Sequence, residues 1–262
     1  MHKTFKTALA TTAVATLFAG AAFAQFVPTE MPKFEPATPL TDKPQIPWAT
    51  PPMPEILRNW KPVTAEQLRK PSDGEWINFR RTYDGWGYSP LNQINTGNVS
   101  RLQPVWSLAT GVAEGHQAPP QVVNGVMIVA TPGAQIIAIE AATGKILWRY
   151  RRNLPEDIIY PHPTSRGVGI LGDKIYFAAP DAFLVAIDIK TGKEVWATKV
   201  ADYKAAYYMS LAPLVAGGKV ILGTSGGEYG IRGFVAGFDP DTGKEAWRTF
   251  VVPEPEVGRA HV

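Results

Sequence analysis

The chain of 262 residues contains no cysteine. This absence excludes a disulfide, a covalently attached haem and a lipid-modified amino-terminal cysteine. No stripe of lysine and arginine indicates a nucleic-acid partner, and no segment sustains the 3.6-residue periodicity of long helices, which excludes a helical solenoid. Histidine is scarce, without the spacing of metal ligands, and occurs only at His2, His116, His162 and His261.

The first 24 residues have the pattern of a secretory signal peptide. Lys3 and Lys6 precede an apolar run from Ala8 to Ala21, and Ala22-Phe23-Ala24 forms a small-x-small cleavage site. The run is short and rich in alanine, so a membrane anchor is disfavoured and no transmembrane span is expected. Cleavage after Ala24 would remove two lysines and change the formal net charge from +3 to +1. We expect an exported, periplasmic protein.

Residues 25–75 form a second region, which is dense in proline between about Phe26 and Pro62. This composition predicts an extended arm or linker, which Trp48 and Trp60 are able to anchor. One short helix is expected at residues 64–69, with Thr64 as its N-cap.

A six-residue motif then recurs three times. It ends each time in a tryptophan, and the tryptophans are 48 and 51 residues apart; the copies are Thr143-Gly144-Lys145-Ile146-Leu147-Trp148, Thr191-Gly192-Lys193-Glu194-Val195-Trp196 and Thr242-Gly243-Lys244-Glu245-Ala246-Trp247. A period of this length is typical of propellers, solenoids and arrays.

Short β-branched and aromatic runs separated by Gly, Pro and Asp precede each motif, which predicts strands. Asp-x-x-Thr-Gly-Lys is typical of a hairpin turn that the Asp caps and in which the Gly has a positive φ. Each copy therefore predicts most of a four-stranded antiparallel blade, with its Trp packed between neighbouring blades. The alternative is a β-meander in a sandwich, which three copies in phase disfavour.

The segment from Trp76 to Asn95 (WINFRRTYDGWGYSPLNQIN), together with the repeats, resembles the amino-terminal part of quinoprotein alcohol dehydrogenases. The resemblance extends over about Val63 to Val252. It implies an all-β fold: residues 76–262 would form an incomplete β-propeller of the quinoprotein type. About three to four blades of an eight-bladed fold are expected, because the 187 residues from Trp76 onward are too few for eight blades of roughly 50 residues each.

The resemblance also implies the cofactor pyrroloquinoline quinone (PQQ), a planar quinone with three carboxylates, and a metal ion that polarises it. Residues that match the family's cofactor-binding positions are Gln117, Arg166, Ser210, Ser225, Gly226 and Gly227. Glu228 matches the position of a calcium ligand; calcium and a lanthanide stay open. Gln117 stands where the family has glutamate, and Ser210 replaces a threonine.

Two departures bear on activity. Tyr160-Pro161 stand where the family has a pair of adjacent cysteines that form a disulfide beside the quinone. The family's catalytic aspartate, second metal ligand and aromatic floor match no residue of this chain, so no catalytic residue is assigned. We expect the amino-terminal part of an enzyme that oxidises alcohols to aldehydes and passes electrons to a cytochrome c.

The chain alone is expected to be inactive and to need a complementary carboxy-terminal portion of the propeller. The alternative function is that of a non-catalytic periplasmic propeller acting as an assembly or binding scaffold. A degenerate gene product without function is a third reading.

Overall fold

The computed structural model describes residues 52–161 and 163–252. The signal peptide and most of the proline-rich arm lie outside these residues, so those predictions are not addressed by the structure. The described chain is built from three four-stranded antiparallel sheets, which we call blades 1, 2 and 3. Blade 1 contains β1 (Gln121–Val123), β2 (Val126–Thr131), β3 (Gln135–Glu140) and β4 (Ile146–Arg151). Blade 2 contains β5 (Gly169–Leu171), β6 (Lys174–Ala178), β7 (Phe183–Asp188) and β8 (Glu194–Lys199). Blade 3 contains β9 (Leu214–Ala216), β10 (Lys219–Gly223), β11 (Phe234–Phe238) and β12 (Glu245–Phe250).

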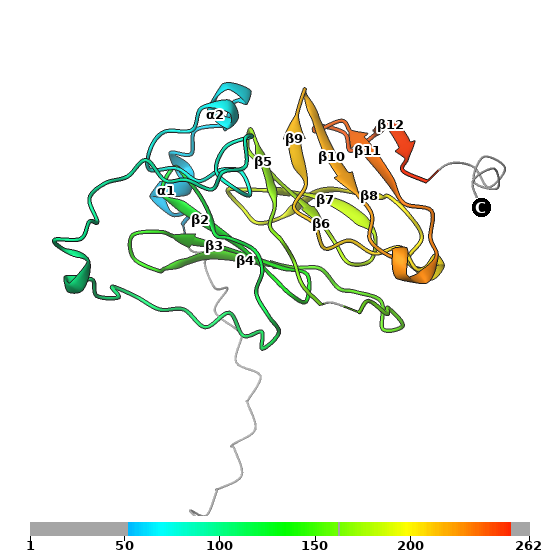
Figure 1. The fold of residues 1–262 in the computed structure, drawn as a ribbon, viewed down its shortest axis with the longest axis horizontal. Coiled ribbons are helices and arrows are strands. Elements are labelled where there is room, and N and C mark those ends of the chain that lie inside the picture. Colours follow the sequence, from blue (N-terminus) through cyan, green and yellow to red (C-terminus); the bar gives the residue numbers. More distant parts are fainter. Residues whose placement is uncertain (1–51, 162, 253–262) are drawn as a thin grey trace, which may run out of the picture. The chain divides into compact units, whose positions relative to one another are not determined.

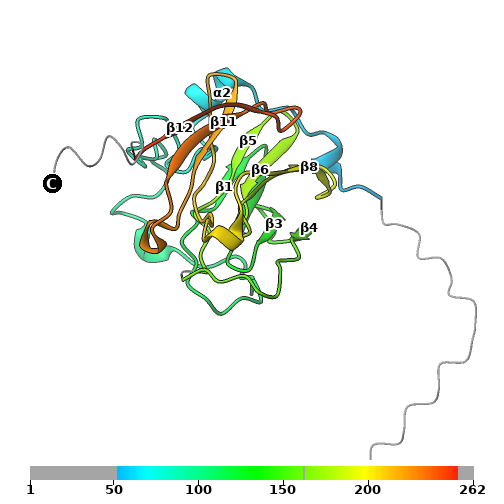
Figure 2. The same cartoon turned by 90° about the vertical axis from the view of Figure 1, so that its right-hand side faces the viewer.

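In each blade the strands pair in the order in which they occur in the sequence. Figure 1 shows the three blades side by side, from green through yellow to orange, and Figure 2 shows them from the carboxy-terminal side. The third strands β3 and β7 are almost wholly buried, whereas the fourth strands β4 and β8 are half-exposed. Both faces of these third strands are thus covered, which explains their continuous runs of Ile, Val, Leu and Ala. The expected all-β propeller architecture is confirmed.

The few helices are short. They are α1 (Glu55–Arg58), α2 (Ala65–Arg69), η1 (Val99–Arg101), η2 (Tyr203–Ala205) and η3 (Gly227–Tyr229). The predicted cap of α2 is confirmed, because Thr64 Oγ1 accepts a hydrogen bond of 3.1 Å from the Gln67 amide. Of the predicted anchors, Trp60 is buried and its indole N–H donates to the carbonyl oxygen of Gly172 at 3.3 Å, whereas Trp48 lies outside the described residues. Within residues 52–161 and 163–252, no helix has the length and apolar character needed to cross a membrane.

The turn before the fourth strand of each blade explains the repeated motif. Asp188 Oδ1 accepts hydrogen bonds from the amide and the hydroxyl of Thr191, and Asp239 does the same one blade later. In blade 1 the equivalent residue is Glu140, whose longer carboxylate receives only the hydroxyl of Thr143. The predicted aspartate cap therefore holds for two copies and is wrong for the first, because the extra methylene changes where the carboxylate reaches.

Two of the three repeat tryptophans, Trp148 and Trp196, lie between blades as the repeat predicts, whereas Trp247 lies against Gly237 of its own blade within the described residues. Trp148 of β4 covers Gly192 in the turn of blade 2, and its indole N–H donates to the Ile189 carbonyl oxygen at 2.8 Å. A Cβ on Gly192 would lie 2.6 Å from Cδ2 of Trp148. Trp196 of β8 covers Gly243 of blade 3 at a similar distance, but its buried indole N–H has no hydrogen-bond partner among the described residues. Each turn glycine is therefore required both for its positive φ and for the absence of a side chain.

Trp106 is a third tryptophan with this role, which the sequence did not reveal. Trp106 precedes blade 1, covers Gly144, and donates its indole N–H to the Ala141 carbonyl oxygen at 3.0 Å. No Thr-Gly-Lys turn precedes it, so the repeat does not reveal it; its only signal is its position 42 residues before Trp148. The glycines of the three Thr-Gly-Lys turns are thus each covered by a tryptophan.

Candidate functional site

Two predicted residues, Arg166 and Ser210, meet where blade 2 lies against blade 3. Arg166 precedes β5 and Ser210 precedes β9, and the Arg166 amide donates to the Ser210 carbonyl oxygen at 3.0 Å. The guanidinium Nη1 also donates to Ser210 Oγ at 2.6 Å. Ser210 is buried and Arg166 is exposed. A buried hydroxyl therefore orients a cation that remains accessible to an anionic ligand.

The predicted turn Ser225–Glu228 is held against the same segment. Ser225 and Tyr208 exchange backbone hydrogen bonds of 2.9 and 3.3 Å. Gly226 has a φ of +120°, and a Cβ there would overlap the carbonyl oxygen of Ala206. Only glycine fits this position, because both the backbone conformation and the close approach exclude a side chain. The turn leads directly into η3, which carries Glu228.

Tyr208 is a site residue that sequence reasoning missed. Its hydroxyl donates to Glu228 Oε1 at 2.5 Å, and its side chain is buried whereas Glu228 is exposed. Burial, and then the hydrogen bond to and charge of Glu228, raise the pKa of Tyr208 to about 12. Tyr208 therefore stays protonated at neutral pH and donates to the carboxylate. The only signal in the sequence is its place two residues before Ser210.

The chain order brings these contacts together, since Tyr208 and Ser210 are separated by one residue. Ser210 accepts a hydrogen bond from the exposed Arg166, and Tyr208 donates one to the exposed Glu228. The two charged side chains are therefore held by the same short segment. Gln117 is also exposed, but no hydrogen bond among the described residues joins it to any of the other predicted site residues. Its assignment to the site stays a prediction from the resemblance alone.

Buried polar atoms beside these residues bear on which ligand fits. Thr164 Oγ1 and Thr224 Oγ1 are buried and have no hydrogen-bond partner within the described part of the chain. Thr164 is two residues before Arg166, and Thr224 directly precedes Ser225. Buried hydroxyls without a partner are uncommon in proteins. A guanidinium, hydroxyls and a glycine-lined turn fit a flat ligand that carries carboxylates.

The same region contributes only a single carboxylate toward a metal ion. No group of three or more His, Asp or Glu side chains that could hold a metal ion occurs in residues 52–161 and 163–252. Because Ca²⁺ takes six to eight oxygen ligands, Glu228 supplies part of a calcium site at most. Other ligands would come from the cofactor, from water or from other segments.

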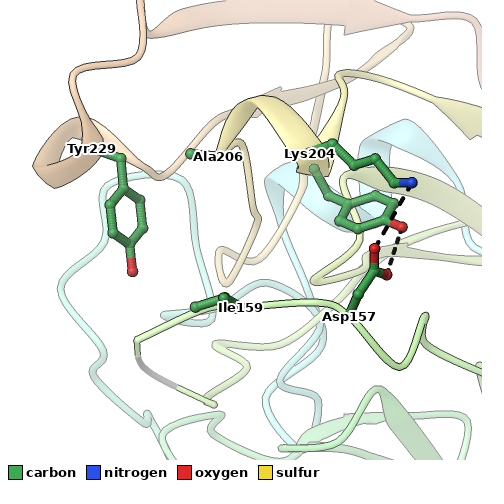
Figure 3. Close-up of a pocket in the computed structure, with 6 residues that line it drawn as sticks. Asp157, Ile159, Lys204, Ala206 and Tyr229 are labelled. Carbon is green, nitrogen blue, oxygen red and sulfur yellow. Dashed lines mark hydrogen bonds and ion pairs between the residues drawn. The ribbon is translucent and has the colours of Figure 1, made fainter.

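A pocket of about 340 Å³ lies next to this turn and is drawn in Figure 3. Its lining residues include none of the predicted cofactor residues; they are Asp157, Ile159, Tyr203, Lys204, Ala206 and Tyr229. Asp157 accepts a hydrogen bond of 2.9 Å from the Tyr203 hydroxyl and lies 3.8 Å from the Lys204 ammonium. Its charges pair with each other, so the pocket offers no unpaired charge to a ligand.

Stacked four-stranded antiparallel blades, joined through tryptophans and glycines, define a β-propeller protein. Residues 76–261 match the PQQ family described as "Glucose/ethanol/alcohol dehydrogenase, beta-propeller domain". The match covers well over half of the chain, which therefore belongs to the PQQ-dependent dehydrogenase propeller family.

The relatives are quinone-linked alcohol dehydrogenases. The dehydrogenase subunit of alcohol dehydrogenase (quinone) from Gluconobacter oxydans is 41% identical over 192 residues, which are 70% of this chain and 25% of that subunit. The quinoprotein ethanol dehydrogenase of Pseudomonas aeruginosa is 42% identical over 214 residues, which are 76% of this chain and 34% of the relative. The chain thus spans about a quarter to a third of the length of these relatives.

Solved structures agree. The quinohemoprotein alcohol dehydrogenase ADHIIG of Pseudomonas putida superposes with a TM-score of 0.68 and 37% identity, over 73% of this chain and 29% of that chain. A europium-containing methanol dehydrogenase gives a TM-score of 0.68 and 34% identity, over 73% and 34% of the two chains.

Proposed function

We propose that this chain forms the carboxylate-binding part of the cofactor site in a PQQ-dependent alcohol dehydrogenase. The observation that carries the proposal is the hydrogen bond of 2.6 Å from the exposed Arg166 guanidinium to the buried Ser210 hydroxyl. The Arg166–Ser210 pair lies beside the glycine turn that carries Glu228, and Tyr208 joins this turn to the segment that contains Ser210. Arg166 and Ser210 would hold a carboxylate of PQQ by charge-assisted hydrogen bonds, and Glu228 would bind calcium or a lanthanide.

In this proposal, the residues of this chain bind and orient the cofactor. Ser225 and Gly226 would approach the flat face of the cofactor through the backbone, because the absence of a Cβ at Gly226 lets it lie close. Bound PQQ supplies the quinone that accepts hydride from an alcohol. The general base that takes the alcohol proton is not assigned to any residue here. The whole reaction, from alcohol to aldehyde, is therefore proposed for the propeller to which this chain contributes.

The setting of the enzyme forms part of the same proposal. The pattern of residues 1–24 supports export to the periplasm with cleavage after Ala24. The chain has no cysteine and so no attached haem of its own. Electrons would leave the reduced cofactor to a cytochrome c.

A binding measurement tests the cofactor site. Free PQQ is titrated against the purified chain and binding is followed by equilibrium dialysis. Arg166→Ala should weaken binding by roughly 10- to 100-fold, the usual effect of losing a hydrogen bond to a charged group. The control is Arg69→Ala, which removes an exposed arginine of α2 whose ion pair with Glu66 lies outside the site. Equal affinities for the three chains would overturn the assignment and favour a non-catalytic scaffold.

An activity assay tests how much of the enzyme the chain provides. We expect no dye-linked alcohol oxidation from the purified chain supplied with PQQ and Ca²⁺, because no catalytic base is assigned in it. Robust turnover by the 262-residue chain would refute this expectation.

A further inference from the structure

The outermost strand of blade 1 has an open edge. β4 pairs with β3 on one side, and no backbone hydrogen bond joins its other edge to any residue of 52–161 or 163–252. The backbone N–H and C=O groups along such an edge can pair with another extended chain. Ile146 at the start of β4 is 37% exposed, so the edge is accessible there.

A groove of about 480 Å³ lies along this part of β4. Its apolar lining comes from Ile146, Leu147 and Trp148 of β4, and from Met53 and Leu57 at the start of the described chain. A hollow of this size accommodates a ligand of moderate size or the side chains of a bound segment. Because the groove is concave, it fits a segment that enters it better than the flat surface of a membrane.

Three lysines surround the groove, and its lining among the described residues contains no carboxylate. Lys145 lies in the turn before β4, and Lys190 and Lys193 lie in the equivalent turn of blade 2. Lys190 pairs with Asp173 at 3.3 Å, whereas Lys145 and Lys193 have no ion pair within the described part of the chain. Two ammonium groups are therefore available to an anionic ligand.

The carboxylates that neighbour these two lysines in the sequence are engaged elsewhere. Glu194 accepts a hydrogen bond of 2.9 Å from the Tyr150 hydroxyl and lies 3.6 Å from the Arg152 guanidinium. Glu140 accepts a hydrogen bond from the Thr143 hydroxyl inside its own turn. The groove thus keeps a positive charge that an acidic ligand would complement.

The corresponding place between blades 2 and 3 has a different charge. In the repeat, Lys190 corresponds to Asp241, which forms an ion pair of 2.8 Å with Lys174. An acidic residue thus replaces one of the three lysines, and only Lys193 and Lys244 keep their charge there. The positive groove is therefore specific to the boundary of blades 1 and 2 and is not a general property of the repeat.

We propose that the edge of β4 and this groove bind an extended acidic segment of a partner protein, which pairs with β4 as an added strand and places carboxylates at Lys145 and Lys193. The unpaired backbone groups favour a peptide over a small anion, and the lysines favour acidic side chains. A second copy of this chain would not pair through the same edge, because the like charges of the two edges repel.

The proposal does not rest on cofactor binding. The groove lies at the end of blade 1 where β3 turns into β4, whereas Glu228 follows the turn between β10 and β11 of blade 3. In an antiparallel four-stranded blade these two kinds of turn lie at opposite ends of the strands. Peptide binding should therefore leave Arg166 and Glu228 free, and Arg166→Ala should not change it.

Peptide binding to the purified chain tests the charge. The probe is a fluorescein-labelled octapeptide of alternating glutamate and valine, followed by fluorescence anisotropy, and the matched peptide has glutamine in place of glutamate. The double variant Lys145→Gln/Lys193→Gln should weaken binding of the acidic peptide by about 2- to 30-fold, the range for two exposed ion pairs. The control Lys244→Gln, which changes the equivalent lysine of blade 3, should bind as the unmodified chain does.

Hydrogen exchange tests the strand pairing. The acidic peptide at saturation should slow exchange of the β4 amides severalfold and leave the amides of β8 and β12 unchanged. Absence of binding, equal binding of the glutamine peptide, an unaffected double variant or unprotected β4 amides would each overturn the proposal. Self-association that protects β4 without peptide would assign the edge to a second copy. Phosphatidylglycerol vesicles that displace the peptide would assign the groove to a membrane, and both results would also overturn the proposal.

Discussion

Replacing Gly192 by alanine tests how closely the Trp148 indole packs on the next blade. Gly192 has a φ of +69°, and its new Cβ would lie 2.6 Å from the indole. The matched control is Gly133→Ala in the β2–β3 turn, where φ is +72° and nothing lies within 4 Å of the added atom. Both variants carry the same cost for left-handed backbone, about 1–2 kcal/mol, and the same gain of about 0.4–1 kcal/mol from a less flexible unfolded chain.

Only Gly192→Ala adds the overlap with the ring, which costs about 1–3 kcal/mol for overpacking. Gly133→Ala should therefore lower the free energy of unfolding by about 1 kcal/mol, and Gly192→Ala should lower it by about 2–4 kcal/mol. Unfolding in urea measures both values. A double variant with Trp148→Ala should lose the extra cost of the alanine, because the two residues couple directly. If the two alanine variants unfold at the same urea concentration, the close approach of ring and glycine is refuted.

Three further predictions concern single side chains. Trp196→Ala should lower the free energy of unfolding by about 3–5 kcal/mol and Trp247→Ala by clearly less, because among the described residues only the first ring is covered by another blade. Urea unfolding of both variants compares them, and equal losses would contradict this reasoning. Hydrogen bonds from Thr242 hold the pKa of Asp239 below its ordinary value of 3.8. The stability that Asp239 provides should therefore be full above pH 3.8 and be lost as the pH falls through the lower pKa of the folded state. Carbon-detected NMR titration measures this pKa, and an ordinary value would contradict the cap. Tyr208→Phe should remove one tyrosine, with a pKa of about 12, from an alkaline absorbance titration. It should also speed hydrogen exchange in the turn that carries Glu228, because the hydrogen bond from the phenol is lost. Unchanged exchange would show that the phenol does not hold this turn.

The parts of the fold that follow from short-range contacts were predictable from the sequence. The cap of α2 joins Thr64 to a residue three positions away, and the turn of blade 2 joins Asp188 to Thr191 at the same spacing. Such motifs can be predicted from the sequence because their hydrogen bonds join residues within one turn of the backbone. The blades followed from repetition of these turns at a nearly constant interval, which a single chain displays without any alignment.

Long-range pairings between irregular segments were not predictable. Trp106 covers a glycine 38 residues further on, and no local motif announces it. Tyr208 reaches Glu228 across 20 residues, from a segment without regular secondary structure. Such contacts depend on how neighbouring blades bring loops together, and tyrosine has no spacing rule that would reveal it. The resemblance supplied Arg166 and Glu228 but not the residue that links them.

The direction of the seating has a consequence for synthesis on the ribosome. Each tryptophan that lies between two described blades is translated before the glycine it covers: Trp106 precedes Gly144, and Trp196 precedes Gly243. An interface between two blades can therefore close only after the later turn has left the ribosome. Blades would pack in order from the amino terminus, and at every stage the most recently made blade would carry a tryptophan that no later turn glycine yet covers.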